Sequence, residues 1–456
     1  MKSTETIAAI STGSTASAVG MVRLSGEKAI EIADLIFKSK SGQKLCDKKG
    51  YTALFGNVYD NDGVFDTAVA LVFRAPKSYT GEDIVEITVH GGIYLTKRLL
   101  RAALSCGARL AEAGEFTKRA FLNSKMTLSQ AEAVTALISA QGQEQAKAAL
   151  YVTEGRLNKE CSQIKEKITV LLGQISAYCD YPDEDIVDVS RETLLKELEE
   201  IKTKLSNLLR DFDKGKVLSQ GIDTAIVGSP NVGKSTIMNL LSGFEKSIVT
   251  DIAGTTRDIV EDTVRVGDFT LRLSDTAGIR ETADVVEAVG VERARKRIDT
   301  AALILAVFDA SKPLCDEDLK LIDSMKGKNA IAIINKDDLD GSIDEEVIKS
   351  GFDKVIRISA KTSAGAKILE ETITSSLEEF KLSSDALIII NERQFDCASR
   401  ALKEIEGAYF ATKEGQMPDM IGITLEEALF ALCELSGESA TEAVVNEIFS
   451  KFCVGK

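Results

Sequence analysis

One short motif, Gly228-Ser-Pro-Asn-Val-Gly-Lys-Ser235, constrains the fold of this 456-residue chain more than any other feature. It follows an apolar segment at residues 224–227, which is predicted as a strand, and it opens a segment with helical spacing. Glycine lets backbone N–H groups wrap around phosphates, Lys234 brings a cation to the β- and γ-phosphate oxygens, and Ser235 offers a hydroxyl to Mg²⁺. A chance glycine-rich turn is the alternative, and the strand before it and the helix after it count against that reading.

Three further motifs follow, each at the end of a predicted strand: Asp275-Thr-Ala-Gly278, Asn335-Lys-Asp-Asp338 and Ser359-Ala-Lys361. Asp275 can hold Mg²⁺ through water. The carboxylate of Asp338 can accept two hydrogen bonds from the N1–H and 2-NH₂ edge of guanine, which adenine does not offer. Each motif alone would be weak evidence, but all four in order at strand ends predict a GTP-binding domain.

The loop Thr250–Asp258 has the composition of a switch. A Thr in such a loop can complete the Mg²⁺ shell only while the γ-phosphate is present. The glutamine that positions water in Ras-like switches is absent, since Ile279-Arg280 follows the second motif. Ser235 and Thr256 are the predicted Mg²⁺ ligands. The predicted nucleotide-binding residues are Asn231, Val232, Gly233, Lys234, Ser235, Thr236, Thr250, Asp251, Ile252, Ala253, Gly254, Thr255, Thr256, Asp275, Thr276, Ala277, Gly278, Asn335, Lys336, Asp338, Ser359, Ala360 and Lys361.

Composition is that of an ordinary soluble protein, with 44% hydrophobic and 28% charged residues. A net charge of −15 argues against a partner held mainly by non-specific phosphate attraction, although a local RNA-binding patch stays open. The N-terminus lacks the pattern of a secretion signal, and no run reaches the roughly eighteen apolar residues of a membrane helix. Eight scattered cysteines without a CxxC pair indicate reduced thiols and no zinc site. A cytoplasmic protein without membrane contact is expected.

The spacing of apolar residues divides the chain into four ranges. Residues 1–120 are predicted to form a small α+β domain. Residues 121–217 and 381–456 are predicted to be helical, and residues 218–380 alternate strands and helices, which favours a mostly parallel sheet. The expected fold is therefore α/β plus α+β, with a Ras-like P-loop GTPase domain inserted into an α-helical domain and preceded by the α+β domain.

Local patterns predict several individual elements. Asp60-Asn-Asp-Gly63 lies between two strand-like segments and predicts a hairpin turn. Apolar residues from Leu194 to Phe212 follow four-three spacing, which predicts a long amphipathic helix. Capping-box spacing predicts helix starts at Thr127 with Gln130, Thr424 with Glu427, and Ser439 with Glu442.

Several motifs together resemble one family. The phosphate loop, Gly254-Thr-Thr-Arg-Asp258 and Asp275-Thr-Ala-Gly-Ile-Arg280 are similar to those of the tRNA-modifying GTPase family MnmE, also called TrmE. The resemblance covers essentially the whole chain, so it is more specific than a likeness to GTPases in general. The matching segments outside the α/β range are Ser78–Asp83, Gly114–Thr117, Arg119–Asn123, Tyr181–Glu184 and Phe452–Lys456.

The resemblance implies that residues 1–120 bind 5-formyltetrahydrofolate or a related folate and make the protein a homodimer. A carboxylate suits the adjacent donors of a pterin ring, and Glu86 lies on the polar face of a predicted strand at residues 83–90. A solvated strand residue is the alternative reading of Glu86. The loop Thr12–Ala18 departs from the family, which is expected to have a Pro/Gly/Arg-rich loop there. The folate residues implied by the resemblance are Arg23, Glu86, Lys125 and Lys456.

The resemblance also implies a potassium ion that supports hydrolysis. Asn231 would bind it through its side chain, and the backbone carbonyls of Thr250, Ile252 and Thr255 would complete the site, while Glu287 would orient the attacking water. The alternatives are that Asn231 only forms a turn and that Glu287 is a solvated helix residue. Cys453 is a candidate by resemblance, and the alternative is that it is a packed thiol. His90, the single histidine, is expected to have a structural role. The candidate catalytic residues are Lys234, Arg280, Glu287 and Cys453.

By resemblance, we expect a GTPase that binds GTP and GDP and acts with MnmG (GidA), a FAD-dependent partner, in a heterotetramer-type complex. Together they would modify carbon 5 of the wobble uridine of certain tRNAs with a one-carbon unit from folate. The alternative is a ribosome-assembly GTPase whose flanking domains bind RNA. The acidic balance and the lack of a basic aromatic patch count against that alternative.

Overall fold

The computed structural model divides by its internal contacts into two compact units, Met1–Thr135 with Cys433–Lys456, and Ala136–Leu432. The C-terminal 24 residues thus belong to the same unit as the N-terminus, while the four-range division proposed from sequence stays a prediction. No helix among the described residues is long and apolar enough to cross a membrane. The structure describes residues 5–455 except 14, 181–189, 211, 213, 214, 216, 219, 220, 244–261, 276–300, 384, 385 and 453.

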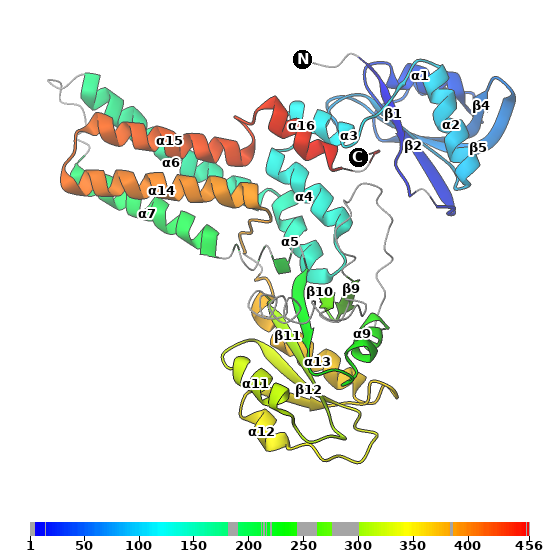
Figure 1. Ribbon diagram of the computed structural model, residues 1–456. Helices are drawn as coiled ribbons and strands as arrows, with labels where there is room; N and C mark the ends of the chain where they lie inside the picture. The colour runs from blue at the N-terminus through cyan, green and yellow to red at the C-terminus, as the bar shows by residue number, and fades with distance from the viewer. Residues whose placement is uncertain are drawn as a thin grey trace, which may run out of the picture. The chain divides into compact units, whose positions relative to one another are not determined.

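The first unit contains a seven-stranded sheet in the order β3-β4-β5-β6-β2-β1-β7. The predicted hairpin is confirmed, since Asp60 pairs with Gly63 between β4 and β5. Helices α1 (Ala29–Ile36) and α2 (Ile93–Ser105) pack on one face of this sheet (Figure 1). The strands are β1 (Ile7–Ile10), β2 (Val19–Ser25), β3 (Phe37–Ser39), β4 (Thr52–Asp60), β5 (Gly63–Phe73), β6 (Ile84–His90) and β7 (Arg109–Leu110).

Alternation in the central strands separates a core face from a polar face. Val85, Ile87 and Val89 of β6 are buried against the helices. Because side chains alternate along a strand, Glu86 lies on the opposite face. Arg23 of β2 is its register partner in the antiparallel ladder, so the two charged residues stand side by side.

Helices α3 (Glu115–Leu122) and α16 (Glu442–Ser450) also belong to the first unit, and α4 (Leu128–Ser139) begins in it and extends past residue 135. Phe449 and Phe452 pack with Leu128 in one small core. The predicted cap at Thr127 is confirmed, because Thr127 and Gln130 exchange side-chain to backbone hydrogen bonds. Sequence spacing alone located this helix start correctly.

The other two predicted caps are wrong. Helix α15 (Pro418–Ser436) begins at Pro418, whose fixed φ suits a first helical position, so Thr424 lies inside the helix and its hydroxyl donates to Ile421 O. Helix α16 is capped by Thr441, which accepts from Val444 N, and not by Ser439. Both segments contain a second residue that starts the helix more effectively than the predicted one.

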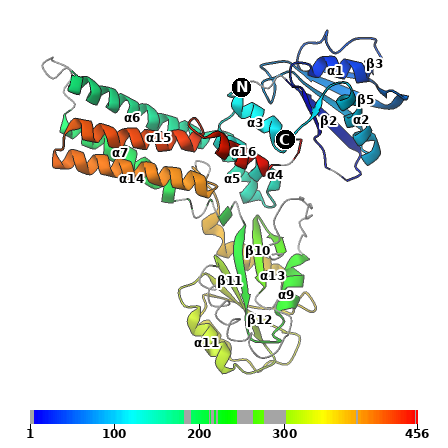
Figure 2. The same ribbon diagram turned by 45° about the horizontal axis from the view of Figure 1, so that its top comes forward.

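The second unit contains a long helical core built from two parts of the chain. Leu198, Ile201 and Leu205 of α7 are fully buried, as the apolar stripe predicted. They share a core with α14 and α15, which follow the α/β segment in sequence, and α7 lies beside α14 (Figure 2). The predicted insertion of an α/β domain into a helical domain is confirmed. The helices are α5 (Gln143–Thr153), α6 (Arg156–Asp180), α7 (Arg191–Arg210), α14 (Glu392–Glu414) and α15.

The inserted segment forms a six-stranded sheet in the order β13-β12-β11-β8-β10-β9, parallel except for β9. The phosphate loop begins directly after β8, and the Asn335–Asp338 motif begins at the last residue of β12. Asp275 is the last residue of β10, and the Ser359–Lys361 motif begins two residues after β13. The strands are β8 (Ile222–Val227), β9 (Asp262–Val266), β10 (Phe269–Asp275), β11 (Leu303–Asp309), β12 (Ala330–Asn335) and β13 (Lys354–Arg357). The helices are α9 (Lys234–Ser242), α11 (Asp316–Ser324), α12 (Glu345–Lys349), α13 (Ala366–Ser376) and the 3₁₀ turn η1 (Glu378–Phe380).

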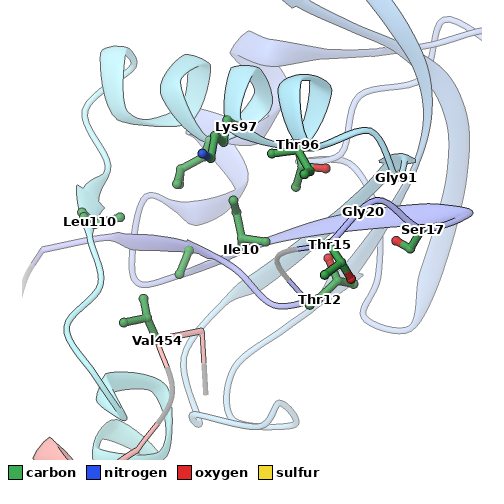
Figure 3. A pocket seen from close by; sticks show the side chains of 14 residues that line it. Ile10, Thr12, Thr15, Ser17, Gly20, Gly91, Thr96, Lys97, Leu110 and Val454 are labelled. Atoms are coloured by element: carbon green, nitrogen blue, oxygen red, sulfur yellow. The ribbon is translucent and has the colours of Figure 1, made fainter. Parts of the chain in front are cut away.

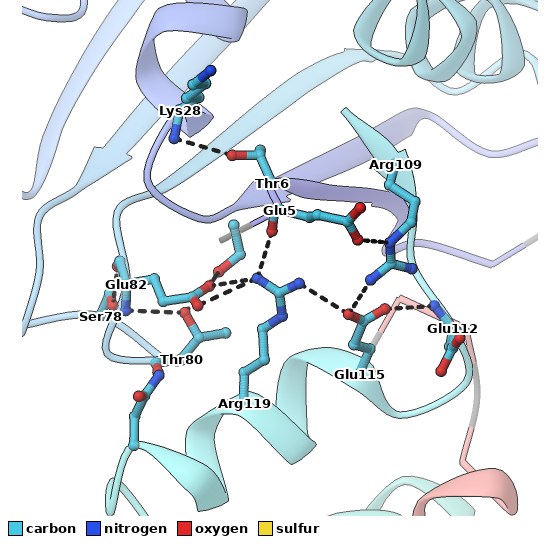
Figure 4. Close-up of polar contacts among 12 residues, drawn as sticks. Glu5, Thr6, Lys28, Ser78, Thr80, Glu82, Arg109, Glu112, Glu115 and Arg119 are labelled. Atoms are coloured by element: carbon cyan, nitrogen blue, oxygen red, sulfur yellow. Dashed lines mark hydrogen bonds and ion pairs between the residues drawn. The ribbon is translucent and has the colours of Figure 1, made fainter. Parts of the chain in front are cut away.

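A buried ionic network joins helix α3 to the sheet of the first unit (Figure 4). Arg119, only 4% exposed, donates to Glu82 at 3.1 Å, to Glu115 at 2.9 Å and to the carbonyl of Glu5 at 2.9 Å. Burial alone would raise the pKa of Glu115. Hydrogen bonds from Arg109, from the Glu112 N–H and from Arg119 outweigh burial, so this pKa lies below the ordinary value of 4.5.

We expect Glu115→Gln to lower the free energy of unfolding by about 3 kcal/mol at neutral pH, because it removes one partner of a buried ion pair. The pKa of Glu115 is lowered by folding, so its stabilisation is complete above the unfolded value near 4.5 and is lost as the pH falls through the folded value. Denaturant unfolding across this pH range should show the two proteins converging in acid. Glu447→Gln, which breaks an exposed pair with Lys451, is the control and should change stability little.

Candidate functional site

The phosphate loop connects β8 to α9 and depends on two glycines. Gly228 and Gly233 have φ of +146° and +101°, and a Cβ at either would collide with Val307 O or the Asn335 side chain. Helix α9 starts at Lys234, so the backbone N–H groups of its first turn face the phosphate loop and can bind an anion held there. The ammonium of Lys234 bridges the carbonyls of Gly228 and Ser229 at 2.8 and 3.0 Å. Both glycines of the predicted loop thus have a backbone conformation and surroundings that exclude other residues, and phosphate binding stays a prediction.

Asn335 joins three of the four motifs. Its side chain is buried, with Nδ2 donating to Val232 O in the phosphate loop at 2.9 Å. Its Oδ1 accepts from Ala360 N, in the Ser359–Lys361 motif, at 3.0 Å. Asn335 was predicted to bind the nucleotide, and in the structure its amide holds the loops around the nucleotide site together.

Lys336 belongs to the Asn335–Asp338 motif, called the guanine motif below, and its side chain extends to the phosphate loop. Its ammonium donates to Asn231 O at 2.8 Å and to Asp309 Oδ2 at 2.6 Å. Asp309 ends β11 and is 6% exposed. Sequence reasoning missed Asp309, although a carboxylate closing an otherwise apolar strand is an indication that could have found it.

Asp338 is exposed and carries the predicted guanine contact. Ser359 Oγ donates to its Oδ1 at 2.6 Å, and this hydrogen bond is the main cause of a pKa below the usual range. The carboxylate is therefore ionised and orientated, while the neighbouring Asp337 turns to Arg357 at 2.8 Å. An ionised, exposed carboxylate at this position is a suitable acceptor for the two donors of a guanine edge.

Part of the predicted nucleotide site is not described. Asp275 closes β10 beside Ile226 of β8, as expected, and Ser235 and Thr236 are exposed in the first turn of α9. The structure brings together the phosphate loop, the Asn335–Asp338 motif and the Ser359–Lys361 motif. The predicted residues that lie outside the described part of the chain are Thr250, Asp251, Ile252, Ala253, Gly254, Thr255, Thr256, Thr276, Ala277, Gly278, Arg280, Glu287, Cys453 and Lys456.

A second polar site lies on the sheet of the first unit. Arg23 Nε and Nη2 both contact Glu86 Oε1 at 2.8 Å, and the side chains are 15% and 14% exposed. The guanidinium lies over Tyr79 and Phe116, 5.6 Å from each ring centre. Sequence reasoning missed both aromatic residues as site residues, although each lies in a segment that matched the family.

Lys125, the third predicted folate residue, contacts the segment that contains Tyr79. Its ammonium donates to Pro76 O at 3.0 Å, and its side chain lies beside Gly81. The C-terminal tail also reaches this sheet, since Val454 forms a bridge with Ala113 and Ser11 Oγ donates to Gly455 O at 3.2 Å. His90 is exposed and pairs with Asp66 at 2.7 Å, which joins β6 to β5 and fits the structural role expected for it.

A cavity of about 290 Å³ opens between the start of α2, the loop after β1 and the tail (Figure 3). Aliphatic side chains, among them Ile10, Leu110 and Val454, make up much of its wall. Lys97 is the single charged side chain among the described residues that line it, and threonine and serine hydroxyls supply its other polar groups. Part of the divergent loop Thr12–Ala18 lines this cavity.

The α/β segment has the features of a P-loop GTPase. Its mostly parallel sheet carries a phosphate loop, a guanine motif and the Ser359–Lys361 loop, and the buried amide of Asn335 joins all three. Comparison with known proteins narrows the class. The family model described as "GTP-binding protein TrmE N-terminus" matches residues 6–125, and "MnmE helical domain" matches residues 128–453.

Curated relatives match over the full length. The "tRNA modification GTPase MnmE" of Clostridioides difficile is 39% identical over 455 residues, covering 99% of both chains. The proteins of the same name from Acetivibrio thermocellus and Lactococcus lactis are each 41% identical, covering 99% of this chain and 99% and 98% of their own. The chain belongs to the MnmE (TrmE) family of tRNA modification GTPases. The family and the GTPase activity expected from sequence are confirmed.

We expect Asp338→Asn to weaken GTP binding about 100-fold or more, because the amide presents a donor to a guanine donor. Xanthosine triphosphate, with an oxygen in place of the 2-amino group, should gain affinity for the variant. Titration with both nucleotides measures the exchange. Asp337→Asn is the matched control, since Asp337 faces Arg357, and it should leave GTP affinity unchanged. Equal GTP affinity for Asp338→Asn and wild type would contradict the assignment.

Proposed function

We propose that this chain uses GTP hydrolysis to drive modification of carbon 5 of the wobble uridine in certain tRNAs, with the FAD-dependent protein MnmG (GidA) as partner. The observation that carries the proposal is the full-length match to tRNA modification GTPases, 39–41% identical over 99% of this chain. GTP hydrolysis would supply conformational change, and the carbon would come from a folate bound to the first unit. Assembly as a homodimer, a heterotetramer-type complex with MnmG and a cytoplasmic location stay predictions.

The proposed nucleotide site uses residues of the phosphate loop and of the Asn335–Asp338 motif. The N-terminus of α9 and Lys234 would hold the phosphates, and the Asp338 carboxylate would hold guanine. A Mg²⁺ ion would neutralise phosphate charge, with the Ser235 hydroxyl and Thr256 as its protein ligands. Ser235 is exposed at the first turn of α9, which suits a ligand that reaches a bound ion.

The proposal includes a potassium ion beside the phosphates. Asn231 has φ of +65°, its backbone carbonyl is bound by Lys336, and its side chain is exposed. The amide oxygen is therefore available, and oxygen ligands suit an alkali cation. The carbonyls of Thr250, Ile252 and Thr255 would complete the site. Glu287 would orient the water that attacks the γ-phosphate.

The folate proposal rests on the Glu86 carboxylate. Both contacts from Arg23 go to Glu86 Oε1, and among the described residues no hydrogen bond reaches Oε2. That oxygen is free to accept from the donor edge of a pterin, while the Arg23 guanidinium is held over the Tyr79 and Phe116 rings. Lys125, Lys456 and Cys453 are proposed to complete the site at its edge.

A strain that lacks this protein should lose the modified wobble uridine, and mass spectrometry of its tRNA nucleosides measures the loss. Complementation with wild type should restore the modification. Complementation with Glu86→Ala should fail to restore it although the purified variant hydrolyses GTP at the normal rate, because the two sites lie on different domains. Intact modification together with defective ribosomal particles would instead support a ribosome-assembly GTPase.

Hydrolysis should be fast in KCl and slow in NaCl, because the potassium ion would balance charge that builds between the β- and γ-phosphates. Asn231→Ala should remove the difference between the salts. Glu287→Ala should abolish turnover while GTP still binds. Steady-state phosphate release in the two salts measures all three, and equal wild-type rates would refute the role of the ion.

A further inference from the structure

The end of strand β11 supports two loops of the nucleotide site at once. Asp309, its last residue, pairs in register with Asn335 of β12, where the guanine motif begins. Two residues earlier, the carbonyl of Val307 lies so close to Gly228 that no Cβ fits there. This short stretch of β11 therefore contacts both the phosphate loop and the loop that carries the guanine motif, called the guanine loop here.

The two oxygens of Asp309 have separate partners. Oδ1 accepts from the backbone N–H and the hydroxyl of Ser311, at 3.1 and 2.7 Å. Oδ2 accepts from Lys336 Nζ at 2.6 Å. Burial alone would raise the pKa of Asp309, but the hydrogen bonds from Lys336 and Ser311 outweigh it and lower the pKa. The side chain is thus charged and buried, and its hydrogen bonds with Ser311 fix its orientation. It therefore holds the ammonium of Lys336 in a defined position.

Lys336 continues from this anchor to the backbone of the phosphate loop, where it donates to Asn231 O at 2.8 Å. Asn231 has φ of +65°, in the left-handed region, which Asn enters more readily than most L residues but less readily than glycine. Its side chain is exposed, so packing does not hold it there. Among the described residues, the hydrogen bond from Lys336 to its carbonyl is the contact that restrains this backbone.

We infer that Asp309 is a positioning residue which, through Lys336, holds Asn231 in its left-handed conformation and thereby ties the phosphate loop to the guanine loop. Without Asp309 the ammonium of Lys336 would lose its anchor, and Asn231 would relax towards conformations in which the loop no longer wraps phosphate. Closing the guanine loop on its base would then no longer order the phosphate loop. The inference rests on nucleotide binding and does not depend on the potassium proposal.

A double-mutant cycle with fluorescent mant-GDP tests this route. Asp309→Asn alone should weaken mant-GDP binding about 10-fold, a typical size for coupling between sites. Glycine adopts positive φ at no steric cost, so Asn231→Gly needs no restraint. In the Asn231→Gly background, Asp309→Asn should therefore weaken binding by at least about threefold less than it does in wild type. Asp337→Asn, which breaks the neighbouring pair with Arg357, is the matched control and should change affinity less than twofold.

Each outcome decides the inference. A purely structural role would lower thermal stability and would weaken mant-GDP binding equally in both backgrounds, which overturns the inference. Unchanged affinity for Asp309→Asn also overturns it. If the asparagine variant unfolds, Asp309→Glu in the same two backgrounds gives the same comparison, because the longer carboxylate displaces Lys336 but keeps the charge. Equal rates in KCl and NaCl would refute only the potassium proposal.

Discussion

The nucleotide site depends on one buried amide. Asn335 donates to the phosphate loop and accepts from the Ser359–Lys361 loop, so loops separated by more than a hundred residues are held at fixed distances. A buried amide left without these partners would be costly, because its desolvation is offset only by the two hydrogen bonds. The loops therefore assemble together, and their packing sets the positions of Lys234, Lys336 and Asp338.

The first unit uses the same principle with charges. Arg119 pairs with Glu115 within helix α3 and joins this helix to Glu82 and to the carbonyl of Glu5, which lie 37 and 114 residues away in the sequence. This network supports the segment that carries Tyr79, against which Arg23 packs. Arg23 lies over Tyr79 and over Phe116 of helix α3, so the segments that the network joins also contact the Arg23–Glu86 pair.

Sequence patterns predicted what depends on local geometry. The Asp60–Gly63 turn, the Thr127 cap and the α7 stripe were right, since each is set by residues a few positions apart. The caps at Thr424 and Ser439 were wrong for the same reason: spacing alone does not rank competing starts, and Pro418 and Thr441 started the helices instead. For the nucleotide site, the motifs located the loops, but they did not identify Asp309, which lies outside every motif and pairs with Lys336.

The sequence by itself determined the class of the protein, because the phosphate loop, the guanine motif and the family segments are chemical patterns written in consecutive residues. Only the tertiary structure decided that Asp309 anchors Lys336, that Tyr79 and Phe116 line Arg23, and that the C-terminal tail lies against Ser11. These contacts join residues tens to hundreds of positions apart. Their partners are chosen by strand register and close packing, which no periodicity along the chain records.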